Sequence, residues 1–207
     1  MNVPKNPFAT HPNEDPDHLA ARAAKESFTA AAADIQSDDS RSETWKAERL
    51  AHLHEQHVKE VAEAHQRIIE RRQARLDYLT ALVPSGPGIP EDASEADRSV
   101  LIAAFRHALG EVRQAGAAEQ RARLLAEAER YGDTAMVRAV LTYASEVGEL
   151  DIVEGWVDRT HGAPGYAAEV RQLRSGRGAW DLKDFRPLPK PASRGRVVRP
   201  GVIEYRR

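Results

Sequence analysis

Histidine is the residue type in this sequence that could most readily bind a metal or transfer a proton. Three histidines, His52, His54 and His57, lie within the six residues HLHEQH, and His65 follows. Zinc needs three or four converging protein ligands. On a helix His54 and His57 share a face because they are three residues apart, so one helix supplies only two ligands. We therefore predict no metal site, and expect seam or surface histidines with a mild pH response where one is buried.

Motifs of the common enzyme classes do not occur in the sequence. There is no G-x-S-x-G, no phosphate-binding P-loop, no G-x-G-x-x-G and no H-E-x-x-H. The absence of cysteine excludes disulfides, thiolate zinc sites and a cysteine nucleophile. Asp158, Arg159 and His161 lie close together, but at an expected helix end, where solvated polar residues are ordinary. We predict that the protein is not an enzyme and has no catalytic residue and no cofactor.

Charge is unevenly distributed along a chain whose net charge is only −2. Residues 1–40 hold three basic and seven acidic residues, whereas residues 171–207 hold eleven basic and three acidic ones. An arginine-rich tail with glycine and proline between the charges is typical of an arm that contacts nucleic-acid phosphates. The same composition suits docking on an acidic protein surface, with aromatic residues as anchors. Of these two interpretations we favour the protein surface.

The candidate partner-binding residues of this tail are two aromatic residues and five arginines. They are Trp180, Phe185, Arg177, Arg186, Arg194, Arg196 and Arg199. Further along, RVVRPGVIEY has β-branched residues around a Pro-Gly turn, which favours a short strand or hairpin.

Helical patterns dominate the rest of the chain. The pattern predicts five regions. Residues 1–41 form an extended proline-rich arm and an alanine-rich helix starting at Asp15 and Pro16, and residues 42–83 form a long helix. Residues 84–93 are a Pro/Gly linker, residues 94–175 a helical bundle, and residues 176–207 the basic tail. The long helix has a stripe of apolar residues spaced by three and four, interrupted by histidine and arginine. This favours a helix packed along part of its length over an uninterrupted coiled coil.

A pattern A-x3-G-x4-V-x3-[VL] occurs twice within the bundle region, at an offset of 16 residues, first from Ala128 and again from Ala144. Gly132 and Gly148 suit left-handed positions that end helices, and Asp133 is placed to cap the next helix. The repeat therefore predicts a turn followed by an antiparallel helix, written twice. The part A-x3-G-x2-DIVE, from Ala144 to Glu154, resembles the second helix of ankyrin repeats, but the period and the missing T-P-L-H start indicate convergence.

The fold class predicted from these patterns is all-α: a long N-terminal helix plus a compact antiparallel helical bundle, with extended N- and C-terminal arms. One shared core is expected in the bundle. Its predicted members are Leu101, Phe105, Leu124, Leu125, Val137, Leu141, Ile152, Val153 and Trp156.

Order of segments and composition together point to a class of function. An acidic alanine-rich start, a long charged helix, a helical body and a basic tail resemble the helical virion and assembly proteins of actinobacterial tailed phages. The resemblance lies in organisation and assigns no role to any residue. It implies a non-enzymatic structural or assembly protein that binds neighbouring subunits in a homo- or hetero-oligomer. The alternatives are a nucleic-acid-associated protein that uses the basic tail, or a host helical adaptor.

Location follows from the absence of targeting patterns. No apolar run approaches the roughly 18 residues of a membrane span, and the start of the chain has no apolar signal region. We expect no membrane partner, synthesis in the cytoplasm, and a virion as a candidate final location.

Overall fold

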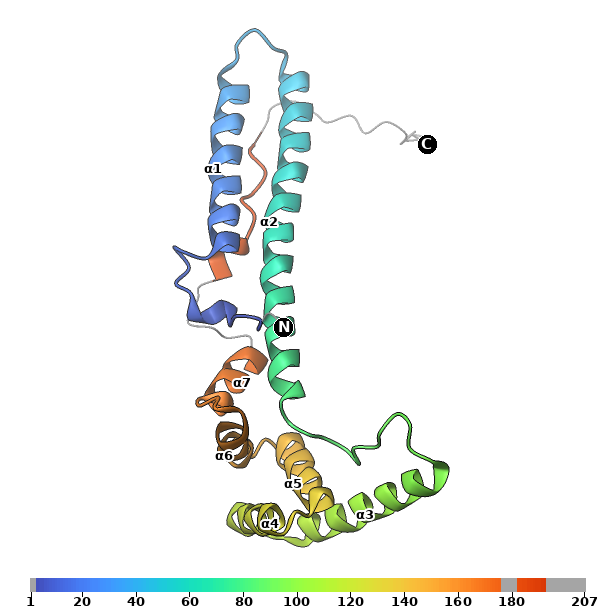
Figure 1. Ribbon diagram of the computed structural model, residues 1–207. Coiled ribbons are helices and arrows are strands. Elements are labelled where there is room, and N and C mark those ends of the chain that lie inside the picture. Colours follow the sequence, from blue (N-terminus) through green and yellow to red (C-terminus); the bar gives the residue numbers. More distant parts are fainter. Residues whose placement is uncertain (1–2, 176–181, 193–207) are drawn as a thin grey trace. The chain divides into compact units, whose positions relative to one another are not determined.

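The computed structural model describes residues 3–175 and 182–192, and in these residues it contains seven α-helices and no strand (Figure 1). The predicted all-α class is confirmed. Trp180, Arg177 and the last three arginines of the candidate set (Arg194, Arg196, Arg199) lie outside the described residues, as does the predicted strand segment.

Two units divide the chain. One, here called the hairpin unit, contains Pro4–Gln73 and Arg177–Arg207; the other, here called the body unit, contains Met1–Val3 and Ala74–Gly176. The boundary falls inside a helix, between residues 73 and 74, and not in the predicted linker 84–93. The hairpin unit is discontinuous in sequence, because Ala74–Gly176 of the body unit lies between its two segments.

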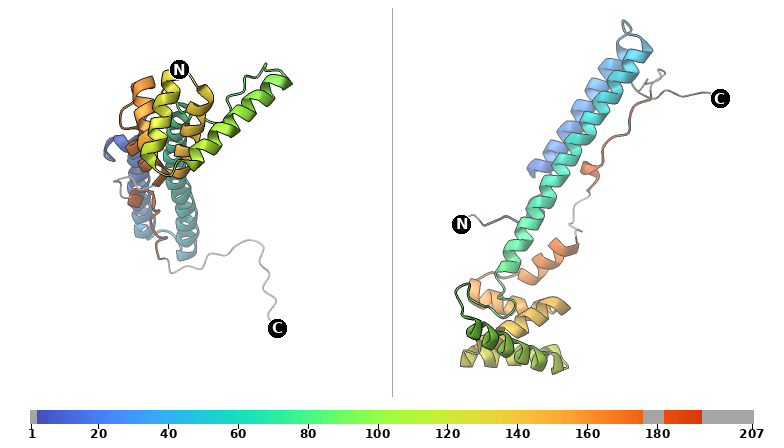
Figure 2. Two further views of the ribbon diagram at one scale, coloured as in Figure 1. Left: turned by 90° about the horizontal axis from the view of Figure 1, so that it is seen from below. Right: turned by 90° about the vertical axis from the view of Figure 1, so that its right-hand side faces the viewer.

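The hairpin unit is built on α1 (Pro16–Ser37) and the first part of α2 (Glu43–Ala81), which run side by side (Figures 1 and 2). Asp15 caps α1 as predicted: its side chain accepts the backbone N–H groups of Asp17 and His18, and Pro16 follows it. A short 3-10 helix, Pro7–Ala9, precedes this start. The packed faces contain Ala21, Phe28, Ala32, Ala47, Leu50, Val61, Ala64 and Ile68.

The body unit contains α3 (Glu95–Gln114), α4 (Ala118–Tyr131), α5 (Thr134–Val147), α6 (Leu150–His161) and α7 (Tyr166–Ser175). The predicted turns of the repeat are present, since Gly132 and Gly148 end α4 and α5 at φ values of 71° and 82°. Asp133 accepts the backbone N–H of Met136 at 2.9 Å, which is the predicted cap of α5. The last turns of α2 belong to this unit, where Arg75 Nε binds Glu169 Oε1 of α7 at 2.7 Å.

The core of the body unit corrects part of the sequence prediction. Of the nine predicted members only Leu125, Leu141 and Val153 are buried, and the other six are partly exposed. The other buried apolar residues of this unit include the leucines Leu79, Leu150 and Leu173. They also include small residues: Ala108, Val112, Ala139, Val140, Ala144, Val157, Ala167 and Val170.

Candidate protein interface

The segment from residue 182 to residue 192, here called the docked segment, lies along the α1–α2 hairpin (Figures 1 and 2). It starts with a 3-10 turn, Leu182–Phe185, and continues as extended chain. Pro187, Pro189 and Pro191 favour this extension, because each ring fixes φ and removes a backbone donor. The hairpin therefore receives an extended peptide with its carbonyls and remaining N–H groups available for recognition.

Phe185 is the apolar anchor of the docked segment, with 7% of its surface exposed. Its ring meets His18 edge-on at a centroid distance of 4.6 Å and stacks with His65 at 5.2 Å. Ala21, Ala64 and Ile68 complete the buried cluster. The sequence predicted Phe185 as an anchor on a partner, whereas its neighbours in the structure belong to its own chain; the aromatic side chain is buried here because α1 and α2 together offer an apolar cleft.

Asp184 adds charge to the same end of the docked segment. His18 Nδ1 lies 3.0 Å from Asp184 Oδ2, and Arg22 Nε donates to the same oxygen at 2.8 Å. Burial raises the pKa of the Asp184 carboxyl, but hydrogen bonds from Arg22 and His18 lower it by more, so this pKa lies below its ordinary value. Lys25 Nζ donates to the Lys183 carbonyl at 2.7 Å. Carboxylate and backbone are thus both recognised by α1.

Two histidines of the HLHEQH stretch bind the backbone of Leu188. The Leu188 N–H donates to His57 Nε2 at 2.9 Å, and His54 Nε2 lies 3.1 Å from the Leu188 carbonyl oxygen. His57 must accept at Nε2, so that nitrogen carries no proton, whereas His54 must donate there. His57 also stacks on Phe28 at a centroid distance of 4.4 Å.

His57 is 2% exposed, and its burial lowers the pKa of the imidazole. A lowered pKa keeps the ring neutral, which is the state that accepts the Leu188 N–H. The sequence predicted ordinary histidines with a mild pH response. In the structure, His54 and His57 form hydrogen bonds with a peptide backbone. In the described part of the chain, no three His, Cys, Asp or Glu side chains are grouped so as to hold a metal ion.

Ion pairs fix the start of α1 on α2. Arg67 Nε binds Asp17 Oδ1 at 2.7 Å, and Arg71 Nη2 lies 2.8 Å from carboxylate oxygens of both Asp15 and Asp17. Asp15 has no exposed surface and Asp17 only 6%. The ion pairs fix the register of α1 against α2, and the carboxylates are stabilised further because they lie at the positive end of the α1 dipole.

Arg186 is the only other member of the candidate set within the described residues, and its side chain is exposed. Sequence reasoning found Phe185 but missed Asp184, His18, His54 and His57 as its recognition partners. A usable signal was present in DFRPLPKP, where an acid–aromatic pair precedes alternating prolines. Nothing in the sequence indicated which surface this peptide would meet.

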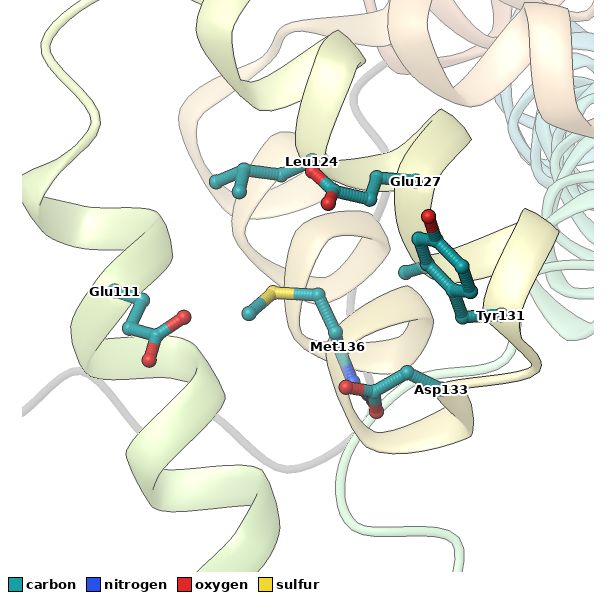
Figure 3. A pocket seen from close by; sticks show the side chains of 7 residues that line it. Glu111, Leu124, Glu127, Tyr131, Asp133 and Met136 are labelled. Atoms are coloured by element: carbon teal, nitrogen blue, oxygen red, sulfur yellow. Dashed lines mark hydrogen bonds between the residues drawn. The ribbon is translucent and has the colours of Figure 1, made fainter.

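In the body unit, one pocket of about 270 Å³ lies between α3, α4 and the start of α5 (Figure 3). Met136 lies in its centre, and Glu111, Glu127 and Tyr131 surround it. The Asp133 carboxylate accepts the hydrogen bond that caps α5. The lining offers carboxylates and an apolar floor, without a nucleophile beside a base, so it has the character of a surface depression.

A second groove, of about 650 Å³, follows α3 and contains the larger apolar surface. Its lining is made by Pro87, Ile102, Phe105, Arg106, Leu109 and Arg113. Val100 near the start of α3 is 67% exposed, and the neighbouring large apolar residues of this helix are only half-buried. Ala108 and Val112 are fully covered. The side of α3 that carries Ala108 and Val112 therefore packs into the body, while the side that lines the groove leaves apolar surface uncovered.

No protein-family model matches the sequence, and neither a curated protein nor a solved structure is significantly similar to it. In the residues that the structure describes, no helix is both long and apolar enough to cross a membrane.

Proposed function

We propose that this chain is a non-enzymatic structural or assembly protein of a multi-subunit particle, and that the particle is a tailed-phage virion. The observation that carries the proposal is the apolar surface that α3 leaves uncovered. Ile102, Phe105 and Leu109 are half-buried along a groove, and Val100, on another side of the helix, is 67% exposed. Burying such surface against a neighbouring subunit is favourable, at about 25 cal/mol per Å² of apolar area.

The remaining surface supports a binding role over a catalytic one. Polar side chains that converge in the hairpin unit are engaged in holding the chain's own peptide, as with Asp184 and His57. The two hollows of the body unit described above, the pocket beside Met136 and the groove along α3, contain no nucleophile beside a base. Rigid helices with one unpaired apolar face are typical of subunits that complete their packing in an assembly.

A direct test is to isolate high-mass particles from the native source on a density gradient and to quantify this chain in them by mass spectrometry. We expect the chain to sediment with the particle in a fixed ratio to the major structural protein. A chain that stays at the top of the gradient, away from every particle, would overturn the proposal.

The exposed cations of the docked segment favour nucleic acid as a second candidate partner. Arg186 and Lys190 are exposed, and Arg194, Arg196 and Arg199 follow in the sequence. If phosphates are the target, affinity for DNA falls steeply with salt and declines with each arginine changed to glutamine. If a protein surface is the target, Trp180→Ala abolishes docking even at low salt. We expect the second pattern.

A further inference from the structure

The groove on α3 combines an apolar stripe with two positive charges. Ile102 and Leu109 are seven residues apart, as are Arg106 and Arg113, so each pair spans two helical turns or about 10.5 Å. All four side chains line the groove. Within the described part of the chain, neither guanidinium has a carboxylate in ion-pair distance. The groove thus calls for an apolar ridge flanked by two carboxylates at the same spacing.

The outer face of α2 in the hairpin unit has this pattern. Ile69 is 39% exposed, and Ala62 lies seven residues before it on the same face. Beside them lie Glu63 and Glu70, also seven residues apart and exposed. Glu63 has only a 3.9 Å contact with Lys59, and Glu70 accepts a hydrogen bond from Gln66. Exposed pairs of this kind contribute little and are easily exchanged for better partners.

We propose that the α3 groove of one copy binds the outer face of α2 of a second copy, with Ile69 in the apolar stripe and Glu63 and Glu70 paired with Arg106 and Arg113. This inference rests on the proposed assembly role and names its partner. The occupant is a second copy because its charges match the groove in sign and in spacing. Two different surfaces meet, so the contact is heterologous and generates a ring or an open filament of copies.

Charge reversal separates this contact from any other mode of association. One full-length variant carries Arg106→Glu and Arg113→Glu, and a second carries Glu63→Arg and Glu70→Arg. A control with Arg123→Glu and Arg130→Glu, on α4, has the same change in net charge and the same spacing. Each variant is first checked for native helix content by circular dichroism, and Arg→Gln or Glu→Gln pairs replace any variant that does not fold.

The readout is the mass of the full-length protein in solution, by sedimentation velocity over a concentration series at low and high salt. We expect wild type and control to rise above the 22.9 kDa monomer with concentration, and to do so less at high salt. Each reversed variant alone should need at least tenfold higher concentration to associate. An equimolar mixture of the two should regain the wild-type behaviour, because opposite charges then meet at both surfaces.

Failure of the mixture to associate, or an equal loss in the α4 control, would overturn the inference. Wild type that remains a monomer at all concentrations would do so too. If that monomer still sediments with the native particle, the assembly role stands and only the second-copy contact fails. If it is also absent from the particle, both proposals fall.

Discussion

The hairpin unit and the body unit bury different chemistry within the same secondary structure. In the described residues of the hairpin unit, six polar or charged side chains are buried: Asp15, Asp17, His18, Lys46, His57 and Asp184. Among the described polar and charged residues of the body unit, only Arg121 is buried, and it pairs with Glu149. The hairpin unit is held by directional contacts to a distant segment of chain, whereas the body unit is held by close packing of apolar side chains.

This difference teaches where each unit is vulnerable. A buried ion pair or histidine stabilises only in one protonation state and one geometry, so the hairpin unit should respond to pH and to single polar changes. Close-packed apolar side chains have no such dependence, but shortening one of them leaves a cavity that its neighbours cannot fill.

The largest effect should come from the centre of the body unit. Leu141 has no exposed surface, so Leu141→Ala should lower the free energy of unfolding by about 2–5 kcal/mol. Trp156 is only partly buried, and Trp156→Ala should cost less than the roughly 3–5 kcal/mol of a fully buried tryptophan. Urea unfolding of both variants checks the order. A larger cost for Trp156→Ala would mean that the apolar centre is wrongly located.

Releasing the docked segment should be the next largest effect. Phe185→Ala removes the buried anchor and should destabilise the docked segment by about 3 kcal/mol. That loss corresponds to roughly 100-fold faster hydrogen exchange through opening of the segment. Hydrogen exchange of peptides that cover residues 182–192 measures this, since the Leu188 N–H is bound to His57. Leu182→Ala is the matched control, because that side chain is 41% exposed. Equal acceleration in both variants would show that Phe185 is no anchor.

Acid should loosen the docked segment before it affects the body unit. Burial lowers the pKa of His57 below its ordinary value of 6.5. As the pH falls below about 6.5, this histidine binds a proton more readily in the unfolded chain than in the docked state, so docking weakens. The groups around the ring are Lys25 on α1 and His54 and Glu60 on α2. Asp184, whose pKa is lowered, contributes stability that is lost only below the ordinary carboxyl range.

Exchange of residues 182–192 at pH 7 and pH 5.5 tests this response. We expect faster opening at pH 5.5 in wild type after correction for intrinsic rates. His57→Gln, which keeps an acceptor without a titrating ring, should reduce the difference, while His52→Gln on the exposed side should leave it unchanged. A pH response that survives His57→Gln in full would assign it to another group.

The smallest effects should come from two glycines of the body unit. Gly148 ends α5 at a φ of 82°, so Gly148→Ala should destabilise by about 1 kcal/mol. Gly155 lies within α6, and a Cβ there would meet only the Arg159 side chain at 3.4 Å. Gly155→Ala should therefore stabilise by about 0.5–1 kcal/mol. Thermal unfolding distinguishes the two signs, and equal shifts would contradict the helix-ending role of Gly148.

Local chemistry made the ends of the helices predictable. Asp15, Ser94 and Asp133 cap helices through their own side chains, and Gly132 and Gly148 end them, all within a few residues of sequence. Which side of each helix is buried was harder to predict from the sequence. Phe105 and Trp156 were expected in the core because of their size, yet both are only partly buried, while the alanine and valine positions Ala139 and Val140 are completely covered.

The recognition of the docked segment was beyond sequence reasoning for a different reason. His18 and Asp184 are 166 positions apart, and their contact depends on how α1, α2 and the returning segment meet. No periodicity connects such residues, because the pairing is set by tertiary geometry. The aromatic anchor was recognisable by its type, whereas its binding site was not.

A cysteine pair tests most directly whether the α3 groove is a contact surface between copies. The chain has no cysteine, so Leu109→Cys in one copy and Ile69→Cys in another form a unique pair on mild oxidation. Mass spectrometry should detect a covalent dimer that joins these two positions in a mixture of the variants. A mixture of Leu109→Cys with Ala126→Cys on α4 is the control. Equal dimer yields in both mixtures, or none in the first, would contradict the claim.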